Sequence, residues 1–366
     1  MALPRFHSLP VCRVDAEAAD AVAVTFQVPA PLRASFGFLP GQFLTVQANI
    51  DGQDVRRSYS ICSTRSAYDT RGELSIGIRP MQDGVFSNWA AQHIKAGNTL
   101  AVMPPEGRFV SDRPRALHRV GFAAGSGITP ILSLMATSLE EQPETKFTLV
   151  YGNRSMASVM FNEALQDLKD RFADRLTLIH ILSRQAQEVD LLQGRIDGQK
   201  IQALIQTLLP AKSMDEVFIC GPEAMIESTE AALLAAGVPA RNIHTERFSS
   251  PTLDALPTAQ RRLAAQSRAP KVTGAVSLTI TLDGKNHSLQ MSHDEHVLDA
   301  ALAAGLDLPY SCKAGVCCTC RAKVTDGTVH MDKNFTLEPW EVAKGFVLTC
   351  QARPTSHNIA INFDDR

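Results

Sequence analysis

The chain has 366 residues, of which 45% are hydrophobic and 20% are charged, a composition typical of a globular protein with two or three domains. Its formal net charge of −2 gives no electrostatic basis for binding nucleic acid or an anionic membrane. The first twenty residues lack the continuous apolar run that a secretory signal needs, so we expect a cytoplasmic protein. Eight cysteines in a reducing compartment indicate metal or redox chemistry rather than a disulfide scaffold.

Residues 1–112 contain short apolar or alternating runs separated by turn residues, a pattern typical of β-strands. One helix-like stretch, residues 86–94, interrupts them. The pattern predicts an antiparallel β-barrel. Its expected strands are 21–28, 41–48, 56–63 and 73–80.

Residues 113–248 differ, because apolar β-runs here alternate with helical stretches. Alternation of this kind predicts an α/β domain with a doubly wound parallel sheet. The expected strands are 119–124, 147–153, 176–182 and 216–221, and the clearest helices are 130–141, 158–172 and 223–236.

Residues 249–272 contain three prolines and no sustained period, and we expect a linker there. In the remaining region, 273–366, two β-runs flank Asp283 and Gly284, which form a typical hairpin turn sequence. A helix that ends at Gly305 follows and precedes a cysteine-rich loop. This order of elements predicts a small C-terminal α+β domain.

The cysteine-rich loop has the sequence CKAGVCCTC. Within it, Cys312, Cys317 and Cys320 have the spacing C-x4-C-x2-C, and Cys350 follows thirty residues later. Plant-type [2Fe–2S] clusters are bound by cysteines with this spacing. We therefore expect these four thiols to be the ligands of such a cluster.

A zinc site made by the same four thiolates is the alternative. Structural zinc sites favour paired C-x2-C units, whereas this chain has only one such pair. The fifth nearby thiol, Cys318, falls between the expected ligands, and we interpret it as a thiol that binds no metal. Residues 273–366 resemble plant-type ferredoxins, and the resemblance implies a β-grasp fold around a [2Fe–2S] cluster.

In the first region, the sequence RRSYSICS places Arg57, Ser58, Tyr59 and Ser60 on an expected strand. Successive strand residues point to opposite faces, so Arg57 and Tyr59 share one face and Ser60 lies on the other. An arginine for a phosphate, an aromatic ring for stacking and a hydroxyl for a ring nitrogen would suit a flavin. The same residues could also form an ordinary amphipathic strand with an exposed arginine.

In the second region, the sequence GSGITP follows an expected strand and precedes a helix. Gly125 and Gly127 would let backbone amides approach a pyrophosphate at the start of that helix. Thr129 suits the N-cap of the helix and Pro130 its first position.

Further polar motifs follow the other expected parallel strands. Open α/β sheets bind ligands at the carboxyl ends of their strands. Each motif could be an ordinary loop beside a helix, but their common position predicts a nucleotide site at one edge of the sheet. They are residues 151–155, Ser183 and Arg184, CGPEAM at 220–225, and ERF at 246–248.

Residues 8–248 resemble the ferredoxin–NADP reductase superfamily, in which the motifs RSYS, GSGITP, YGNRS and CGPEAM occur in this order. The resemblance implies FAD in the barrel, with Arg57 at the flavin phosphate, Tyr59 stacked on the flavin ring and Ser60 bonded to its N5 atom. It also implies that the segment DGVFSNW, with Ser87 and backbone amides, contacts the pyrophosphate.

The same resemblance places Thr129, Cys220 and Gly221 beside the nicotinamide and lets Glu246 and Phe248 close over the flavin. The aromatic residue of plant-type reductases is terminal, whereas Phe248 leads into the expected linker. The expected catalytic residues are Tyr59, Ser60, Cys220 and Glu246.

The expected nucleotide is NADPH, with NADH as the alternative. Ser183 and Arg184 end a strand where the superfamily contacts the 2′-phosphate, and Arg154 offers a second cation. No acidic residue follows the sequence YGN to bind a ribose diol. Both arginines could also be simple surface residues.

These cofactors imply electron flow from NADPH through FAD and the [2Fe–2S] cluster to an acceptor, because a hydride carries two electrons and the cluster accepts one. Three stretches outside the flavin and nucleotide motifs resemble the reductase subunits of bacterial phenylacetyl-CoA epoxidases. The resemblance implies that the acceptor is a multisubunit di-iron oxygenase of phenylacetate degradation. The stretches are FHSL at 6–9, DLLQGRIDGQKIQAL at 190–204 and NFTLEPWEVAKGFVLTCQA at 334–352.

Two other interpretations stay open. The chain could be the reductase of another oxygenase, such as a ring-hydroxylating or steroid hydroxylase system, or of a hybrid-cluster protein. It could also belong to a different class, a redox sensor whose cluster signals instead of passing electrons on. A sensor would turn over slowly with every artificial electron acceptor, whereas a reductase would turn over fast.

Overall fold

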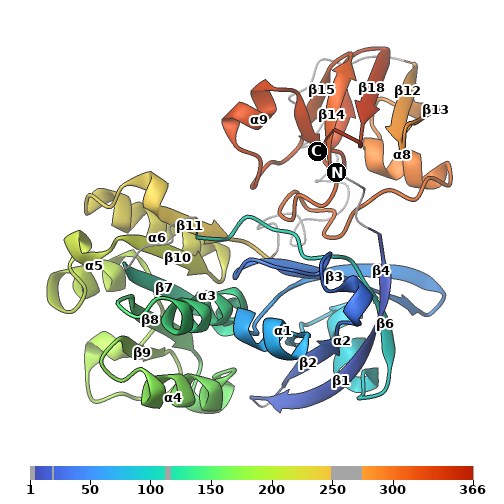
Figure 1. Ribbon diagram of the computed structural model, residues 1–366. Coiled ribbons are helices and arrows are strands. Elements are labelled where there is room, and N and C mark those ends of the chain that lie inside the picture. Colours follow the sequence, from blue (N-terminus) through green and yellow to red (C-terminus); the bar gives the residue numbers. More distant parts are fainter. Residues whose placement is uncertain (1–4, 19, 112–116, 249–273, 366) are drawn as a thin grey trace. The chain divides into compact units, whose positions relative to one another are not determined.

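The structure is a computed structural model that describes residues 5–18, 20–111, 117–248 and 274–365 (Figure 1). Its main sheets are an antiparallel barrel sheet, a parallel sheet and the sheet of a C-terminal α+β domain. The predicted fold class is therefore confirmed. Residues 6–55 and 59–247 form one compact unit, and the C-terminal domain belongs to a second.

The barrel is a six-stranded sheet with the strand order β4-β3-β6-β1-β2-β5. A bridge between Ile61 and Ile76 joins the two ends of this order and closes the sheet. Two short helices, α1 (Arg65–Arg71) and α2 (Val85–His93), lie between strands. The strands are β1 (His7–Glu17), β2 (Ala21–Gln27), β3 (Phe43–Ile50), β4 (Gln53–Ser60), β5 (Glu73–Ile78) and β6 (Thr99–Val102).

The α/β domain has five parallel strands in the order β11-β10-β7-β8-β9. Helices α3 and α4 contribute to the apolar core on one face of the sheet, and α5 and α6 to the core on the other. The strands are β7 (His118–Ala124), β8 (Lys146–Asn153), β9 (Leu176–Leu182), β10 (Glu216–Cys220) and β11 (Ile243–Glu246). The helices are α3 (Ile128–Glu141), α4 (Asn162–Arg171), α5 (Gly198–Thr207) and α6 (Glu223–Ala235).

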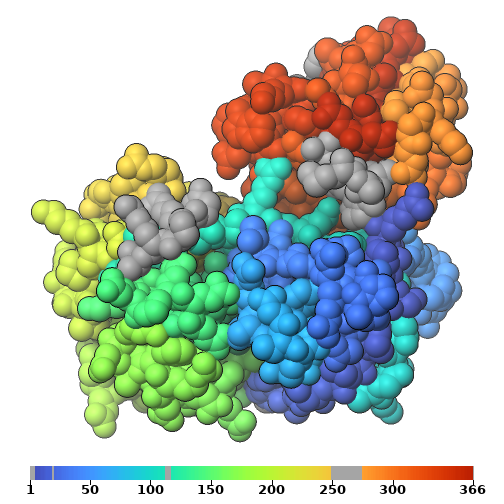
Figure 2. Space-filling model, viewed as in Figure 1, coloured from blue at the N-terminus to red at the C-terminus, as the bar shows by residue number. Residues whose placement is uncertain are grey.

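The barrel and the α/β domain pack directly against each other, and Figure 2 shows their surfaces in contact where blue meets green. Hydrogen bonds reach from α3 to the barrel segment that follows β4. The Ser133 hydroxyl donates to the Ser63 carbonyl at 2.7 Å, and the Ser66 hydroxyl donates to the Glu140 carboxylate at 2.7 Å. The barrel and the α/β domain therefore have a defined mutual position.

The C-terminal domain has a five-stranded sheet, β13-β12-β18-β14-β16, and a small second sheet, β15-β17. Asp283 and Gly284 have φ values of 51° and 72°, the left-handed conformation that a tight hairpin turn between β12 and β13 requires. The strands are β12 (Ala275–Leu282), β13 (Lys285–Ser292), β14 (Arg321–Asp326), β15 (Val329–Met331), β16 (Phe346–Leu348), β17 (Ala352–Pro354) and β18 (Asn358–Asn362). The helices are α8 (Val297–Ala303) and α9 (Pro339–Ala343).

The predicted start of α3 is wrong. The residues Gly125–Gly127 form a 3-10 turn, η2, that leads directly into the helix, so Gly127 is the N-cap and Ile128 the first helical residue. Thr129 therefore lies inside the first turn, where its hydroxyl donates to the Ser126 carbonyl at 3.0 Å. Pro130 is the third helical residue instead of the first.

The expected linker, residues 249–272, falls outside the described residues. The boundaries of the domains at 1–112, 113–248 and 273–366 stay predictions. Among the helices that the structure describes, none combines the length and the apolar character needed to cross a lipid bilayer.

Candidate functional site

The motif residues Arg57, Ser58, Tyr59 and Ser60 are the last four residues of β4. Arg57 is exposed, whereas only 4% of Ser60 is exposed, so their side chains lie in different environments, as expected. The half-buried ring of Tyr59 contacts Phe86 of α2, with 5.7 Å between the ring centroids. This end of β4 therefore presents a cation and an aromatic ring, the groups that a flavin site requires.

The start of α2 is the segment expected to contact the FAD pyrophosphate. Its N-cap is Gly84, and no side chain caps the helix. The Ser87 hydroxyl is buried and accepts a hydrogen bond from the Met81 amide at 3.2 Å, and a Cβ on Gly84 would lie 2.5 Å from that hydroxyl. Because the first amides of a helix lack intrahelical partners, this uncapped end suits a phosphate.

The polar motifs of the α/β domain lie at the carboxyl ends of the parallel strands, the edge at which such sheets bind ligands. One motif ends or follows each of the five strands. The residues at this edge are Gly125, Gly127, Asn153, Arg154, Ser183, Arg184, Cys220, Gly221 and Glu246.

Cys220 is the last residue of β10 and is completely buried. Its neighbours in register are Glu246 on β11 and Ala123 on β7. Burial, and then the charge of Glu246, raises the pKa of the Cys220 thiol well above its usual value, so the thiol is neutral at physiological pH. The expected catalytic residues Cys220 and Glu246 are thus adjacent, although their roles stay predictions.

Arg154 and Arg184 lie side by side at the edge of the sheet. The amide of Arg184 donates to the Arg154 carbonyl at 2.8 Å, and the amide of Ser183 donates to the Asn153 carbonyl at 2.9 Å. Both arginine side chains are exposed, and within the described residues neither forms an ion pair. Two arginines whose backbones are neighbours at this edge offer positive charge that could bind a phosphate.

The expected flavin and nucleotide sites meet where β5 touches the start of α3. A Cβ on Gly77 would lie 2.7 Å from the Thr129 methyl group, so only a glycine permits this approach. Arg79, which sequence reasoning missed, also reaches across this junction and donates to the Ser158 carbonyl at 2.8 Å. An arginine at the end of a strand carries no sequence signal that distinguishes it from a surface residue.

The four expected cluster ligands are Cys312, Cys317, Cys320 and Cys350. Cys317, Cys320 and Cys350 are buried, and Cys312 is half-buried. The hydrogen bond from Cys317, with backbone amides such as that of Ala314, lowers the pKa of Cys312 to about 6. Nearby thiols and burial raise the pKa values of Cys317 and Cys320.

Four thiolates are the number of ligands that a [2Fe–2S] cluster requires, and these four cysteines would supply them. Within the described residues, no three His, Cys, Asp or Glu side chains converge on a single metal position. Gly315 has a φ of 79° and packs against the Lys333 carbonyl, which lets the loop wrap closely. Gln351, which sequence reasoning missed, donates to the Lys313 carbonyl at 3.0 Å and lies 3.7 Å from the Cys350 sulfur.

Two further residues, Cys318 and Phe248, lie near the expected sites. The Cys318 sulfur is half-buried and lies 3.1 Å from the Thr336 hydroxyl, within hydrogen-bond distance, and its exclusion from the ligand set stays a prediction. Phe248 is exposed, and the residues after it lie outside the described part of the chain. Its closure over the flavin stays a prediction.

Three family models match the chain in the order of its domains. They are an oxidoreductase FAD-binding domain at residues 8–110, an oxidoreductase NAD-binding domain at 122–231, and a 2Fe-2S iron–sulfur cluster binding domain at 280–355. Together with the fold, they define a pyridine-nucleotide-dependent flavin oxidoreductase that carries its own [2Fe–2S] domain. The chemistry that bound FAD supplies is the acceptance of a hydride and the release of its electrons one at a time.

Two relatives that match this chain over nearly their full length identify a narrower family within this class of oxidoreductases. The chain is 46% identical to a subunit of the 1,2-phenylacetyl-CoA epoxidase of Escherichia coli over 98% of each chain. It is 35% identical to the ferredoxin reductase component of the Rhodococcus rhodochrous 3-ketosteroid-9-alpha-monooxygenase, over 97% of this chain and 96% of that one. The chain therefore belongs to the family of oxygenase reductases that contains these two proteins.

The solved structure of phthalate dioxygenase reductase, described as modular for electron transfer from pyridine nucleotides to [2Fe–2S], has the same fold. The TM-score is 0.61 over 98% of both chains, and the sequence identity is 21%.

Proposed function

We propose that this protein takes electrons from NADPH and passes them through FAD and its [2Fe–2S] cluster to a multisubunit di-iron oxygenase that epoxidises the ring of phenylacetyl-CoA. The observation that carries the proposal is the 46% identity to the Escherichia coli epoxidase component over almost the whole of both chains. Identity at this level over almost the whole of both chains extends beyond the few residues that hold the cofactors.

The preference for NADPH rests on Arg154 and Arg184. These exposed side chains share one edge of the sheet and are joined through the backbone hydrogen bond of 2.8 Å. A 2′-phosphate offers a dianionic group to this pair, whereas NADH offers two ribose hydroxyls, which gain much less from cations.

The role of this chain's residues in the transfer follows from their places. Gly77 and Thr129 bring the barrel against the start of α3, so that a nicotinamide at the strand edge would lie beside the flavin face of β4. We assign Arg57, Ser58, Ser60 and Ser87 to FAD, and Gly125, Gly127, Thr129, Ser183 and Gly221 to the nucleotide. Hydride transfer needs this kind of close, fixed alignment more than it needs acid–base groups.

The test is reconstitution of the oxygenase reaction. NADPH, this protein and the epoxidase oxygenase subunits are combined, and phenylacetyl-CoA consumption is followed by mass spectrometry. We expect turnover with the wild-type protein and none with Cys317→Ser, which should still reduce ferricyanide from the flavin. Turnover with an unrelated reductase, and none with this one, would overturn the assignment of the partner.

The 3-ketosteroid monooxygenase relative supports a second candidate acceptor, the oxygenase of a steroid hydroxylase system. The same assay with that oxygenase distinguishes the two acceptors, because only the true acceptor should turn over rapidly with this reductase. Electron-transfer partners usually bury less than about 1,200 Å², so turnover is a better test than binding. Rapid reduction of ferricyanide and cytochrome c would speak against the redox sensor, since a sensor has no need of fast turnover.

A further inference from the structure

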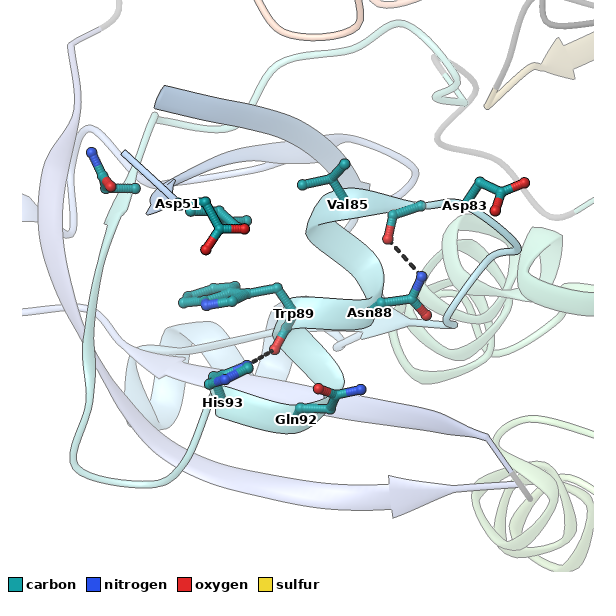
Figure 3. A pocket seen from close by; sticks show the side chains of 10 residues that line it. Asp51, Asp83, Val85, Asn88, Trp89, Gln92 and His93 are labelled. Atoms are coloured by element: carbon teal, nitrogen blue, oxygen red, sulfur yellow. Dashed lines mark hydrogen bonds between the residues drawn. The ribbon is translucent and has the colours of Figure 1, made fainter. Parts of the chain in front are cut away.

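A pocket on the barrel lies between the turn that joins β3 to β4 and helix α2 (Figure 3). In this view Asp51 and Val85 lie on one side of an open space and the indole of Trp89 on the other. Because one wall of the pocket is the segment 83–89 that we assign to FAD, the pocket belongs to the proposed flavin site. A residue outside that site, Gln351 of the C-terminal domain, makes contacts that no motif predicted.

Gln351 directly follows the expected ligand Cys350 and is almost completely buried, with 6% of its surface exposed. Its side chain packs against the cysteine-rich loop, since a Cβ on Gly315 would lie 3.2 Å from the Gln351 Cγ atom. A buried amide is costly unless its hydrogen-bonding groups find partners. The partners of this amide are therefore part of the design of the loop.

The side-chain nitrogen of Gln351 carries two hydrogens and has three acceptors. It donates to the Lys313 carbonyl at 3.0 Å and to the Cys350 carbonyl at 2.9 Å, and it reaches the Cys350 sulfur at 3.7 Å. Lys313 follows Cys312 in the chain, and 38 residues separate it from Gln351. One buried side chain thus bridges the first and the last of the expected cluster ligands.

The Lys313 carbonyl and the Ala314 amide belong to one rigid peptide unit. They point in opposite directions from it, so a hydrogen bond that holds the carbonyl also aims the amide. The Ala314 amide donates to the Cys312 sulfur at 3.3 Å. Lys313 has a φ of 52°, which a residue other than glycine keeps only where its surroundings hold it. Gln351 therefore acts on Cys350 directly and on Cys312 through this peptide unit.

Hydrogen bonds to the ligand sulfurs are one of the means by which a protein sets the reduction potential of an iron–sulfur cluster. Reduction by one electron adds negative charge that the sulfurs share. An N–H group that points at a sulfur stabilises this added charge, so it favours the reduced form over the oxidised form. Loss of such a donor should make the reduction potential more negative.

We propose that Gln351 is a positioning residue that fixes Cys312 and Cys350 and raises the reduction potential of the [2Fe–2S] cluster. The inference rests on the assignment of these two cysteines as cluster ligands. It goes beyond the proposed function, because it holds whichever oxygenase is the acceptor. In the proposed chain of carriers, Gln351 favours the passage of one electron from the reduced flavin to the cluster.

The test is a reductive titration of the full-length protein with its FAD and cluster. Dithionite supplies the electrons through mediator dyes, and electron paramagnetic resonance follows the reduced cluster. Gln351→Met keeps an unbranched side chain but has no N–H donor. We expect it to lower the equilibrium constant for reduction roughly ten-fold, which corresponds to about 59 mV for one electron.

The matched control is Gln290→Met on β13 of the same domain. It also removes a side-chain amide, one that donates to the Ser277 hydroxyl at 3.1 Å, and should leave the potential unchanged. Iron analysis accompanies each titration. The proposal is wrong if Gln351→Met keeps its iron and has the wild-type potential, or if Gln290→Met shifts the potential equally.

A second variant keeps the test decisive if Gln351→Met loses the cluster. Lys313→Gly should then restore the iron in the double variant, because glycine adopts a positive φ without support. The potential of the double variant is compared with that of Lys313→Gly alone, so that the loss of the lysine charge cancels. Failure of the glycine to restore iron, or equal potentials in this pair, would contradict the proposal. The proposed oxygenase function would survive either result, since no acceptor takes part in the measurement.

Discussion

Gly127 lies directly against the backbone of Cys220, and a Cβ on this glycine would come within 2.1 Å of the Cys220 carbonyl oxygen. The contact joins the start of α3 to the end of β10 at the edge where the nucleotide is expected. No real Cβ occupies such a position, so the residue at 127 must be glycine for the two segments to meet.

Gly127→Ala should therefore damage the nucleotide site by pushing α3 away from β10. Overpacking of this kind costs about 1–3 kcal/mol, and we expect kcat/KM for NADPH to fall roughly ten-fold or more. FAD content should be unchanged, because the barrel is not involved. Gly198→Ala is the control, since its nearest neighbour would be an ordinary contact at 3.6 Å. An equal fall in kcat/KM for NADPH in Gly127→Ala and Gly198→Ala would show that the close contact between Gly127 and Cys220 is not the cause of the fall.

The cluster ligands can be separated from Cys318 by iron analysis. Cys312→Ser, Cys317→Ser, Cys320→Ser or Cys350→Ser should each abolish or strongly deplete the cluster, because one of its irons then loses a thiolate. Cys318→Ala should retain both irons and the visible spectrum, since that thiol is half-buried beside Thr336. Loss of iron from Cys318→Ala, with retention in Cys317→Ser, would contradict the assignment of ligands.

Nucleotide preference should depend on the arginines at the sheet edge. Arg184→Ala should raise KM for NADPH roughly ten- to a hundred-fold, the effect of losing a charge-assisted hydrogen bond worth about 1.5–3 kcal/mol. NADH lacks the 2′-phosphate and serves as the internal control, so its KM should barely change. Steady-state kinetics with both nucleotides measure this, and an equal rise in both KM values would make Arg184 a structural residue.

The stability of the C-terminal domain should depend on pH through His296. Its ring nitrogens face Asp332 at 2.9 Å and Asp299 at 3.7 Å, and Arg353 also pairs with Asp332 at 2.8 Å. Burial alone would lower the pKa of His296, but the hydrogen bonds to the two carboxylates outweigh it and raise the pKa. The hydrogen bond from His296 also affects its partner Asp299. It is the main reason that the pKa of Asp299 is lowered to about 2.

A raised histidine pKa adds stability that is fully present below about pH 6.5 and is lost as the pH rises through the folded-state value. His296→Gln should thus lower the free energy of unfolding by about 1 kcal/mol at pH 6 and by clearly less at pH 9. The measurement is the unfolding midpoint followed by the visible absorbance of the cluster, with His287→Gln on β13 as the control. A loss of the same size at both pH values would mean that His296 acts through packing alone.

Much of the fold could be predicted from local patterns. The runs at 21–28, 73–80, 119–124 and 147–153 are strands β2, β5, β7 and β8 within a few residues, because burial on a sheet imposes alternating or continuous apolar character. Other elements were missed, such as α5 and the four-residue strand β11. The strand β11 is too short to show a period. The helix α5 does have local signals, since Asp197 caps it by accepting the Lys200 amide and the buried Ile201 and Leu204 lie three residues apart.

The sequence by itself determined the chemistry of this protein. Cysteine spacing predicted the cluster, and the resemblance of short motifs at strand ends to the ferredoxin–NADP reductase superfamily predicted the flavin and the nucleotide, because these groups need particular residue types at particular separations. Only the tertiary structure decided how those parts meet. The approach of Gly77 to Thr129, the contact of Gly127 with Cys220 and the pocket between Trp89 and Asp51 join residues far apart in the chain. Such contacts arise from the packing of whole domains, and no local spacing encodes them.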